Sequence, residues 1–401
     1  MISKQMQQEI AGSSAIRAMF LEGKEMAKKI GAENVYDFSL GNPMTPVPEA
    51  YNQAIIEAVQ TETSLELHGY MDNAGYPETR QAIAQNLNQR FGTEFEFKHI
   101  VMTVGAAGAL NVVFKTILDP SDEVLVLAPY FGEYRGYIAN HQGILKEVKP
   151  DTSTFQPDLT DLEEKISEKT KAIIINNPVN PTGVIYSEET IKKIASILER
   201  KQKEYAHEIY MVSDEPYREL VYDGYKVPFL TKYYHNTFVT YSFSKSLSIP
   251  GERIGYIAVC PNMADCEQAI SGLSVANRIL GFVNAPSLMQ KALIKCMDER
   301  TDVAYYDKNR NLIYETLTKL GFSCIKPQGA FYLFIQSPDP EEKKFVETAK
   351  KYHILLVGGT SFSCPGYVRL AYCVSYEMIE RSLPAFQKLA EEYKLIPEES
   401  C

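Results

Sequence analysis

Lys245 lies in a polar segment whose side chains could together hold an aldehyde and a phosphate. Ser242 and Ser244 precede the lysine and Arg253 follows it, within Tyr-Ser-Phe-Ser-Lys-Ser-Leu-Ser-Ile-Pro-Gly-Glu-Arg-Ile-Gly at 241–255. A lysine amine forms a Schiff base with an aldehyde when it is shielded and its pKa is lowered. Serine hydroxyls and an arginine fork bind a phosphate monoester. The segment therefore predicts a site for pyridoxal 5′-phosphate, although a solvated loop can carry the same Ser-x-Ser-Lys pattern.

Apolar runs on both sides predict that this segment is a loop between two strands. Residues 237–241 lead into it and residues 254–260 lead out of it. Between about residues 50 and 280, such runs alternate with longer amphipathic stretches, which is typical of an α/β fold whose mostly parallel sheet is covered on both faces. The predicted strands are 100–104, 123–128, 172–176, 209–213 and 237–242, and the predicted helices are 107–117, 134–142 and 188–200.

Small, aromatic or polar residues follow these strands at the points where the strands end. In open parallel sheets, ligands bind beyond the carboxyl ends of the strands. One shared site is therefore predicted there, formed by Gly105-Ala106-Ala107, Phe131, Asn180, Asp214 with Tyr217, and Lys245.

The rest of the chain predicts a second, smaller α+β unit. It would combine an N-terminal segment, 1–47, with the C-terminal part, 286–401, and leave 48–285 as the large domain. The predicted helical regions of the smaller unit are 291–320, 341–352 and 376–393, and its predicted strands are 330–336, 355–357 and 367–373.

The composition excludes several classes of partner. The 401 residues are 45% hydrophobic and 23% charged, as in ordinary globular proteins, and the net charge of −10 argues against nucleic acid or an anionic membrane surface. No apolar run approaches the ~20 residues of a membrane span, and residues 1–10 lack the apolar core of a signal peptide. Seven cysteines without metal-ligand spacing indicate free thiols in a reducing compartment. We expect a cytoplasmic protein without a metal site.

Five motifs stand in the order found in one family. They are Leu-Gly-Asn-Pro at 40–43, Asn-Asn-Pro-Val-Asn-Pro-Thr-Gly at 176–183, Asp-Glu-Pro-Tyr at 214–217, the lysine segment, and Val-Arg-Leu at 368–370. With them the chain resembles, from Ser39 to about Cys373, the aspartate-aminotransferase-like (class I/II) family of fold type I pyridoxal-phosphate enzymes. The resemblance implies a seven-stranded, mostly parallel sheet in a large domain and a smaller α+β domain.

The resemblance also implies roles around the cofactor ring. Lys245 matches the lysine that binds the aldehyde and later moves the substrate's Cα proton as general base and acid. Asp214 matches the carboxylate that keeps the pyridine nitrogen protonated, whereas a helix N-cap is its alternative from the residues alone. Tyr217 and Asn180 match the residues that hydrogen-bond the ring's phenolic oxygen. Phe131 matches the aromatic that stacks on the ring, although an aromatic after a strand is otherwise simply packing.

A second group of matches concerns the cofactor phosphate. Small residues between a strand and a helix let backbone N–H groups reach a phosphate, and otherwise show only close packing. Tyr70 matches the tyrosine that reaches the phosphate bound by the neighbouring subunit, which implies a homodimer with shared active sites. The phosphate-binding residues implied within one chain are Gly105, Ala106, Ala107, Ser242, Ser244 and Arg253.

The last matches concern the substrate. Arg369 matches the arginine that grips the α-carboxylate, and Gly41 and Asn180 lie beside that carboxylate. From the residues alone, an arginine in a strand is usually a surface charge or an ion-pair partner. Arg278, which precedes Asn-Ala-Pro at 284–286, could come from the partner subunit to bind a second carboxylate, but a helix-surface arginine is an equal interpretation.

The function implied is a pyridoxal-phosphate-dependent aminotransferase with a ping-pong mechanism. It would move an amino group from an L-amino acid, with aspartate favoured, to a 2-oxo acid such as 2-oxoglutarate. An aromatic or broad-specificity aminotransferase and a carbon–sulfur lyase on the same site are the alternatives. A transcription regulator with this fold is disfavoured, because the first motif begins after only 39 residues, too few for a preceding helix-turn-helix domain.

Overall fold

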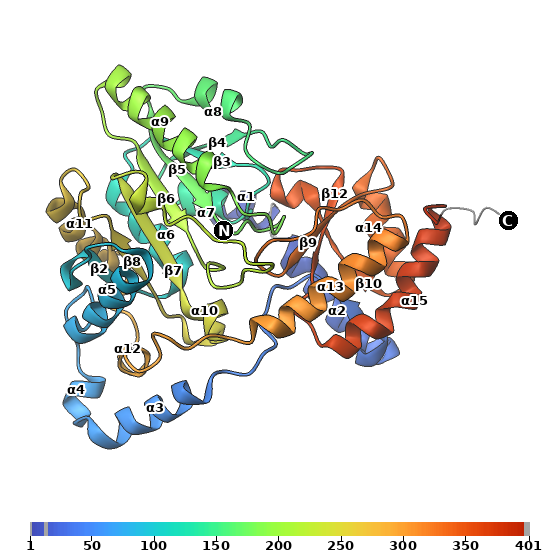
Figure 1. The fold of residues 1–401 in the computed structure, drawn as a ribbon, viewed down its shortest axis with the longest axis horizontal. Helices are drawn as coiled ribbons and strands as arrows, with labels where there is room; N and C mark the ends of the chain where they lie inside the picture. Colours follow the sequence, from blue (N-terminus) through green and yellow to red (C-terminus); the bar gives the residue numbers. More distant parts are fainter. Residues whose placement is uncertain (1, 12–14, 397–401) are drawn as a thin grey trace.

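The computed structural model describes residues 2–11 and 15–396 and contains a large sheet with helices on both faces, beside a smaller region that holds two further sheets (Figure 1). The predicted terminal segments also include residues 1, 12–14 and 397–401, which lie outside the described residues. None of the helices within 2–11 and 15–396 combines the length and apolar character that a membrane crossing needs.

Seven strands form the large sheet in the order β2-β8-β7-β6-β5-β3-β4. β8 runs antiparallel to both of its neighbours, and the other pairs are parallel. The predicted seven-stranded, mostly parallel sheet is therefore confirmed. The strands are β2 (Ile100–Thr103), β3 (Glu123–Leu127), β4 (Ile144–Val148), β5 (Thr170–Asn176), β6 (Tyr210–Asp214), β7 (Thr237–Ser242) and β8 (Gly255–Val259).

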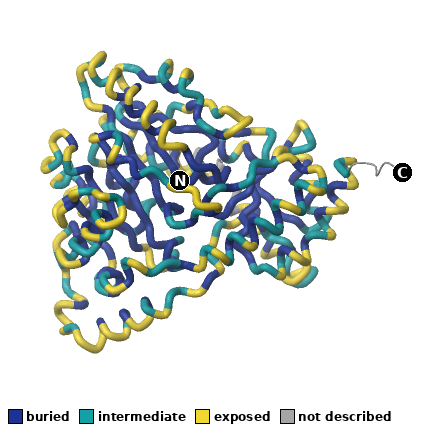
Figure 2. Tube along the Cα trace, viewed as in Figure 1, coloured by how far each residue is buried: buried dark blue, intermediate teal, exposed yellow. Residues whose placement is uncertain are grey.

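Both faces of this sheet are buried, which explains the continuous apolar runs of its strands (Figure 2). Successive strand residues point to opposite faces. Val124 and Val126 thus join a core with α6 and α11, whereas Leu125 and Leu127 join another core with α9. The helices that follow the strands are α6 (Gly105–Ile117), α7 (Tyr134–Ala139), α8 (Leu159–Lys165), α9 (Glu188–Tyr205), α10 (Phe243–Ser246) and α11 (Cys266–Ile279).

A further group of helices packs at the β2 side of the sheet. In Figure 1, α3 runs along the lower edge, and its solvent-facing side carries Ile56 and Val59, which are 49% and 56% exposed. These helices are α3 (Glu49–Thr61), α4 (Ser64–His68), α5 (Pro77–Phe91) and α12 (Ser287–Leu293). Elsewhere in the chain, short 3₁₀ helices lie at Ala32–Asn34, Phe97–His99, Leu230–Lys232, Pro250–Glu252 and Gly359–Phe362.

The smaller region joins the two ends of the chain. β1 (Tyr36–Asp37) pairs in parallel with β10 (Ile354–Leu355), and Phe38 enters a core formed largely by C-terminal residues. A three-stranded antiparallel sheet has the order β11-β12-β9. The division at residues 47 and 286 stays a prediction. The remaining elements are β9 (Tyr332–Gln336), β11 (Val357–Gly358), β12 (Tyr367–Ala371), α1 (Lys4–Ala11), α2 (Ala15–Ile30), α13 (Val303–Lys319), α14 (Glu342–Lys351) and α15 (Tyr376–Glu392).

Three local predictions were wrong. Lys245 lies in the short helix α10 rather than in a loop, because the Ser242 side chain accepts a hydrogen bond from Ser244 N and caps a helical turn. The predicted helix 291–320 is interrupted between α12 and α13, and Asp302 caps α13 by accepting from Tyr305 N. The predicted strand 355–357 is divided between β10 and β11, which pair in different sheets.

Candidate active site

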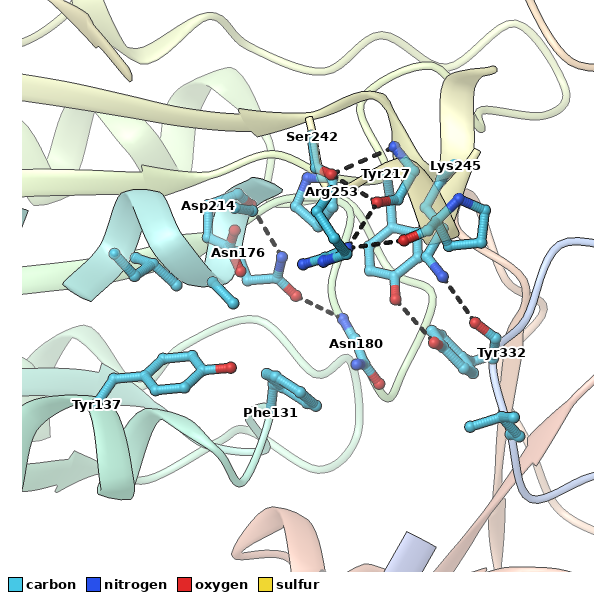
Figure 3. Close-up of a pocket in the computed structure, with 18 of the residues that line it drawn as sticks. Phe131, Tyr137, Asn176, Asn180, Asp214, Tyr217, Ser242, Lys245, Arg253 and Tyr332 are labelled. Carbon is cyan, nitrogen blue, oxygen red and sulfur yellow. Dashed lines mark hydrogen bonds between the residues drawn. The ribbon is translucent and has the colours of Figure 1, made fainter. Parts of the chain in front are cut away.

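One pocket lies at the carboxyl ends of the parallel strands, between the large sheet and the smaller region (Figure 3). Its walls combine residues that follow β2, β3, β5, β6 and β7 with residues from β9, β12 and the N-terminal segment. Of the predicted site residues it is lined by Gly41, Ala106, Ala107, Phe131, Asn180, Asp214, Tyr217, Ser242, Ser244, Lys245, Arg253 and Arg369.

Lys245 presents an amine of unusually low basicity to this pocket. Its Nζ donates a hydrogen bond to the carbonyl oxygen of Gly41 at 2.7 Å, and no carboxylate of the described chain pairs with it. Burial, reinforced by the positive charges of Arg253 and Arg369, lowers the pKa of Lys245 to about 8. A substantial neutral fraction near neutral pH makes this lysine a nucleophile and a proton acceptor.

This lowered pKa gives a testable pH dependence. Only the neutral amine is nucleophilic, so the rate at which acetic anhydride labels Lys245 should rise as the pH passes through about 8. Lys201 is the matched control, because its hydrogen bond to Glu204 raises the pKa of that lysine above the ordinary value. Competitive labelling followed by mass spectrometry of the peptides measures both profiles. A Lys245 profile that coincides with that of Lys201 would contradict the low basicity.

Asp214 places a buried carboxylate at the end of β6 with one oxygen free. Its Oδ2 accepts a hydrogen bond from Tyr134 Oη at 2.5 Å, whereas its Oδ1 is buried and has no hydrogen-bond partner among the described residues. Burial raises the pKa of Asp214 to about 7, although the Tyr134 hydrogen bond opposes that rise. No helix begins directly after Asp214, so the N-cap interpretation is wrong. The free oxygen can receive a cationic N–H group.

Arg369 is a buried cation without an anionic partner. It is 1% exposed, and burial lowers the pKa of its guanidinium. Its Nη1 donates to Asn180 Oδ1 at 3.0 Å and its Nη2 donates to the carbonyl of Ser39 at 2.7 Å, while Nε has no partner within the described chain. Both interpretations from the residues alone, a surface charge or an ion-pair partner, are wrong. A carboxylate that enters the pocket would meet an uncompensated positive charge.

The opposite end of the pocket can bind an anion. Arg253 Nη1 lies 3.5 Å from Ser244 Oγ, and the Ser242 and Ser244 hydroxyls lie 2.8 Å apart. Gly105 begins α6 with φ +79°, and a Cβ there would lie 2.8 Å from Arg253 Nη2. The positive φ favours glycine at this position, and the absence of a side chain leaves room for the arginine beside the start of α6. Backbone N–H groups, hydroxyls and a guanidinium thus converge, as phosphate binding requires.

The aromatic residues form two walls. Figure 3 shows Phe131 and Tyr137 on the side of the pocket away from Ser242 and Lys245. Phe131 packs edge-on against Tyr134, with ring centroids 5.8 Å apart. Tyr217 lies in the other wall, where its hydroxyl contacts that of Tyr332 at 2.7 Å. A flat ring could lie between these walls.

Three predicted residues do not line the pocket within one chain: Gly105 lies beside it at the start of α6, whereas Tyr70 and Arg278 lie away from it. Tyr70 is 93% exposed and lies in a separate surface depression with Leu65 and Met71. Arg278 is exposed on α11 and forms no ion pair with the described carboxylates.

Three site residues were missed by the sequence reasoning. Tyr134 holds Asp214, Tyr332 holds Tyr217, and Asn176 donates to the Asp214 carbonyl at 2.9 Å while accepting from Asn180 N at 2.7 Å. Asn176 had a signal, because it opens the Asn-Asn-Pro motif at the end of β5. The two tyrosines stand among 26 and carry no distinguishing pattern.

Comparisons with known proteins agree with this geometry. The family model described as "Aminotransferase class I and II" matches residues 32–386. A probable aspartate/prephenate aminotransferase of Aquifex aeolicus is 33% identical over 91% of this chain and 94% of its own length. An aromatic-amino-acid aminotransferase 2 of Thermococcus litoralis is 28% identical over 97% of this chain and 98% of its own length.

Solved structures give the same result. An amino transferase from Eubacterium rectale has a TM-score of 0.95 and 47% identity, covering 98% of this chain and 99% of its own. An aspartate aminotransferase from Thermus thermophilus with maleate has a TM-score of 0.85 and 27% identity, covering 97% of this chain and 99% of its own.

Proposed function

Because the chain belongs to the class I and II aminotransferase family, we propose that the pocket around Lys245 transfers the amino group of an L-amino acid, with aspartate favoured, to a 2-oxo acid such as 2-oxoglutarate. One observation supports this most. A weakly basic lysine, an aspartate with one carboxylate oxygen lacking a hydrogen-bond partner, and an arginine without an ion-pair partner among the described residues meet in one pocket.

The residues of the pocket fit pyridoxal 5′-phosphate, the cofactor that this family uses. Asp214 Oδ1 is buried without a partner, which suits a pyridine N–H. Its raised pKa would fall once a positive ring nitrogen approached, so the carboxylate would be charged. The start of α6 with Ser242, Ser244 and Arg253 would hold the phosphate, and Phe131 would cover one ring face. When bound, the cofactor supplies an aldehyde and an electron-accepting ring.

The chain's own groups account for the remaining steps. Lys245 would bind the aldehyde and, when the substrate takes its place, its freed amine would move a proton at the substrate's α-carbon. Arg369 would orient the α-carboxylate, with Asn180 beside it. Gly41 would close the pocket from the N-terminal segment. Tyr217 would direct its hydroxyl at the ring oxygen.

A homodimer would complete the site. The segment that contains Tyr70 exposes Leu65 at 86% and adjoins the exposed apolar residues of α3, and exposed apolar groups of this size mark interfaces. Tyr70 and Arg278 would then act in the partner's pocket. Sedimentation equilibrium that shows only monomer at micromolar concentration would contradict this arrangement.

A cytoplasmic location is part of the proposal. The six cysteines within the described residues form no disulfide, which suits a reducing compartment. Fractionation of the native cells would test it, and recovery outside the cytoplasm would contradict it.

The substrate is tested by a panel of amino donors. The cofactor-loaded protein is mixed with one amino acid at a time, and the loss of its visible absorbance is followed. Aspartate and glutamate should react fastest if the proposal holds. Phenylalanine and tyrosine would react fastest in an aromatic aminotransferase, a class to which the Thermococcus litoralis relative belongs by its description. Pyruvate and ammonia formed from a cysteine conjugate without a 2-oxo acid would identify a lyase instead.

Two arginine substitutions should separate the two carboxylates of the substrate. Arg369→Ala should lower kcat/KM for every amino acid by ~30-fold or more, because a buried charge contact is worth ~2–5 kcal/mol. Arg278→Ala should cause a comparable loss for aspartate and glutamate but spare alanine and phenylalanine. Steady-state kinetics with the four substrates measures both. Arg200→Ala, which removes a surface ion pair with Glu163, is the control. Equal losses for acidic and neutral substrates would show that Arg278 does not select the substrate.

A further inference from the structure

Tyr332 lies at the junction of three groups to which the proposed function gives separate tasks. It comes from β9, is 3% exposed and points into the pocket (Figure 3). Its hydroxyl lies 2.7 Å from that of Tyr217, and its ring centroid lies 4.4 Å from the guanidinium carbon of Arg369. A Cβ on Gly41 would clash with the Tyr332 hydroxyl, so this oxygen packs directly on the backbone that accepts from Lys245.

The hydroxyl of Tyr332 determines where the proton of Tyr217 can point. Each phenol has one proton to donate and lone pairs to accept. Within the described chain, neither hydroxyl has any other hydrogen-bond partner. If Tyr332 donates to Tyr217, the Tyr217 proton is left free for an acceptor in the pocket. If the direction is reversed, Tyr217 has no proton to offer.

Charge favours the first direction. Burial raises the pKa of Tyr332 to about 12, and the Arg369 cation over its ring is the main influence that opposes this rise. The guanidinium carbon of Arg369 lies 4.4 Å from the centroid of the Tyr332 ring, and a cation this close makes a phenol more acidic. The more acidic phenol is the better donor, so Tyr332 donates and Tyr217 accepts.

The ring of Tyr332 has a second partner. The guanidinium of Arg369 packs against the rings of Tyr332 and Phe362, with its carbon 4.4 and 4.8 Å from the two ring centroids. Asn180 and Ser39 hold its Nη atoms, so this packing restricts the tilt of the guanidinium plane. A bidentate contact with a carboxylate depends on that plane.

We propose that Tyr332 is a positioning residue with two separable tasks. Its hydroxyl donates to Tyr217 and thereby leaves the Tyr217 proton directed at the ring oxygen of the cofactor. Its ring fixes the plane of the Arg369 guanidinium in the orientation needed to bind the substrate carboxylate. The inference rests on the proposed function of the pocket.

Two substitutions separate the tasks. Tyr332→Phe keeps the ring and removes the hydroxyl. Tyr217 can still donate to the ring oxygen but loses the bond that polarises its own proton, so the pH midpoint of the bound cofactor's visible absorbance should move upward by less than the roughly 0.4–1 unit that the loss of a whole hydrogen bond would cause. The direction follows because a hydrogen bond to the ring oxygen favours the form in which that oxygen is most negative. Maleate and 3-phenylpropionate, two unreactive carboxylates, should bind this variant within about 2-fold of wild type. Tyr332→Leu should weaken both by about 5-fold or more, since a stacked cation contributes up to ~2 kcal/mol.

The controls identify the route of each effect. Adding Tyr332→Phe to a Tyr217→Phe protein should cause no further midpoint shift, because the hydroxyl acts only through Tyr217. Tyr222→Phe removes another buried hydroxyl, which donates to the Ala330 carbonyl, and should change neither measurement. If Tyr332→Leu does not fold, Tyr332→Met replaces it.

Two results would overturn the inference. An unchanged midpoint in Tyr332→Phe, or an equal shift in the Tyr217→Phe background, would remove the hydroxyl task. Equal carboxylate affinities in the Phe and Leu variants would remove the ring task. Failure of the proposed function is distinguishable, because wild-type protein would then transfer no amino group to 2-oxoglutarate, a result that does not depend on Tyr332.

Discussion

Lys245→Ala should lower turnover by more than about 10⁴-fold, because it removes both the group that binds the aldehyde and the proton carrier at the substrate α-carbon. The variant should still bind pyridoxal phosphate, since the phosphate-binding groups around Arg253 and the ring contact of Asp214 do not depend on the lysine. Steady-state kinetics gives the loss of turnover, and equilibrium dialysis gives the retained cofactor.

The assignment of Lys245 can also be contradicted chemically. Borohydride treatment of the yellow wild-type protein should fix the cofactor to one peptide, the one that contains Lys245. Lys291→Ala is a suitable control, because Lys291 is also largely buried but pairs with Glu62 and Glu78 outside the pocket. A label on any lysine other than Lys245, or turnover by Lys245→Ala near that of Lys291→Ala, would refute the assignment.

Asp214→Ala should lower kcat by about 150- to 5,000-fold, because losing the partner of a buried charge costs ~3–5 kcal/mol and the ring nitrogen would then lose its proton. Asp214→Asn should be nearly as slow, since it keeps the shape and the Tyr134 contact but not the charge. Tyr217→Phe loses one hydrogen bond, worth ~0.5–1.5 kcal/mol, and should be only about 2–13-fold slower. Single-turnover kinetics with a saturating amino donor measures all three.

The order of these losses is the decisive observation. If Asp214→Asn keeps most of the activity, the carboxylate charge is not required, and Asp214 serves only to hold Tyr134. If Tyr217→Phe is slower than Asp214→Ala, the ring oxygen rather than the ring nitrogen carries the larger effect.

The sheet was predictable because its strands are buried on both faces. Residues 172–176 and 237–242 are rich in apolar or β-branched residues and buried throughout, and each lies within or coincides with an observed strand. β4 was missed for the opposite reason: it is an edge strand, and Ile144, Lys146 and Glu147 are exposed or only partly buried, so no apolar run distinguishes it. The sequence pattern did not reveal the interruption between α12 and α13, after which Asp302 caps the start of α13.

The pocket residues that belong to sequence motifs were predictable, and those that reach the pocket only through tertiary packing were not. Lys245, Asp214, Asn180 and Arg369 stand in recognisable sequence patterns, and the structure brings them together. Tyr134 meets Asp214 across 80 positions of the chain, through the packing of α7 on the sheet. Such a contact depends on how the helices pack on the sheet, and the local sequence pattern does not encode that packing.

The pairing of β1 with β10 has a consequence for biosynthesis. Tyr36 is synthesised early but cannot pair with Ile354 until that residue has also left the ribosome. The hydrogen bond from Arg369 to Ser39 is delayed in the same way. At ~5–20 residues per second, this wait lasts tens of seconds. The nascent chain would carry Lys245 and Asp214 on a large sheet that can already form, while the wall that receives the substrate carboxylate has not been made. Residues 354–369, which are synthesised after the large sheet, thus complete the proposed site, and a chain that stops before Arg369 would retain Lys245 without the arginine proposed to hold the substrate.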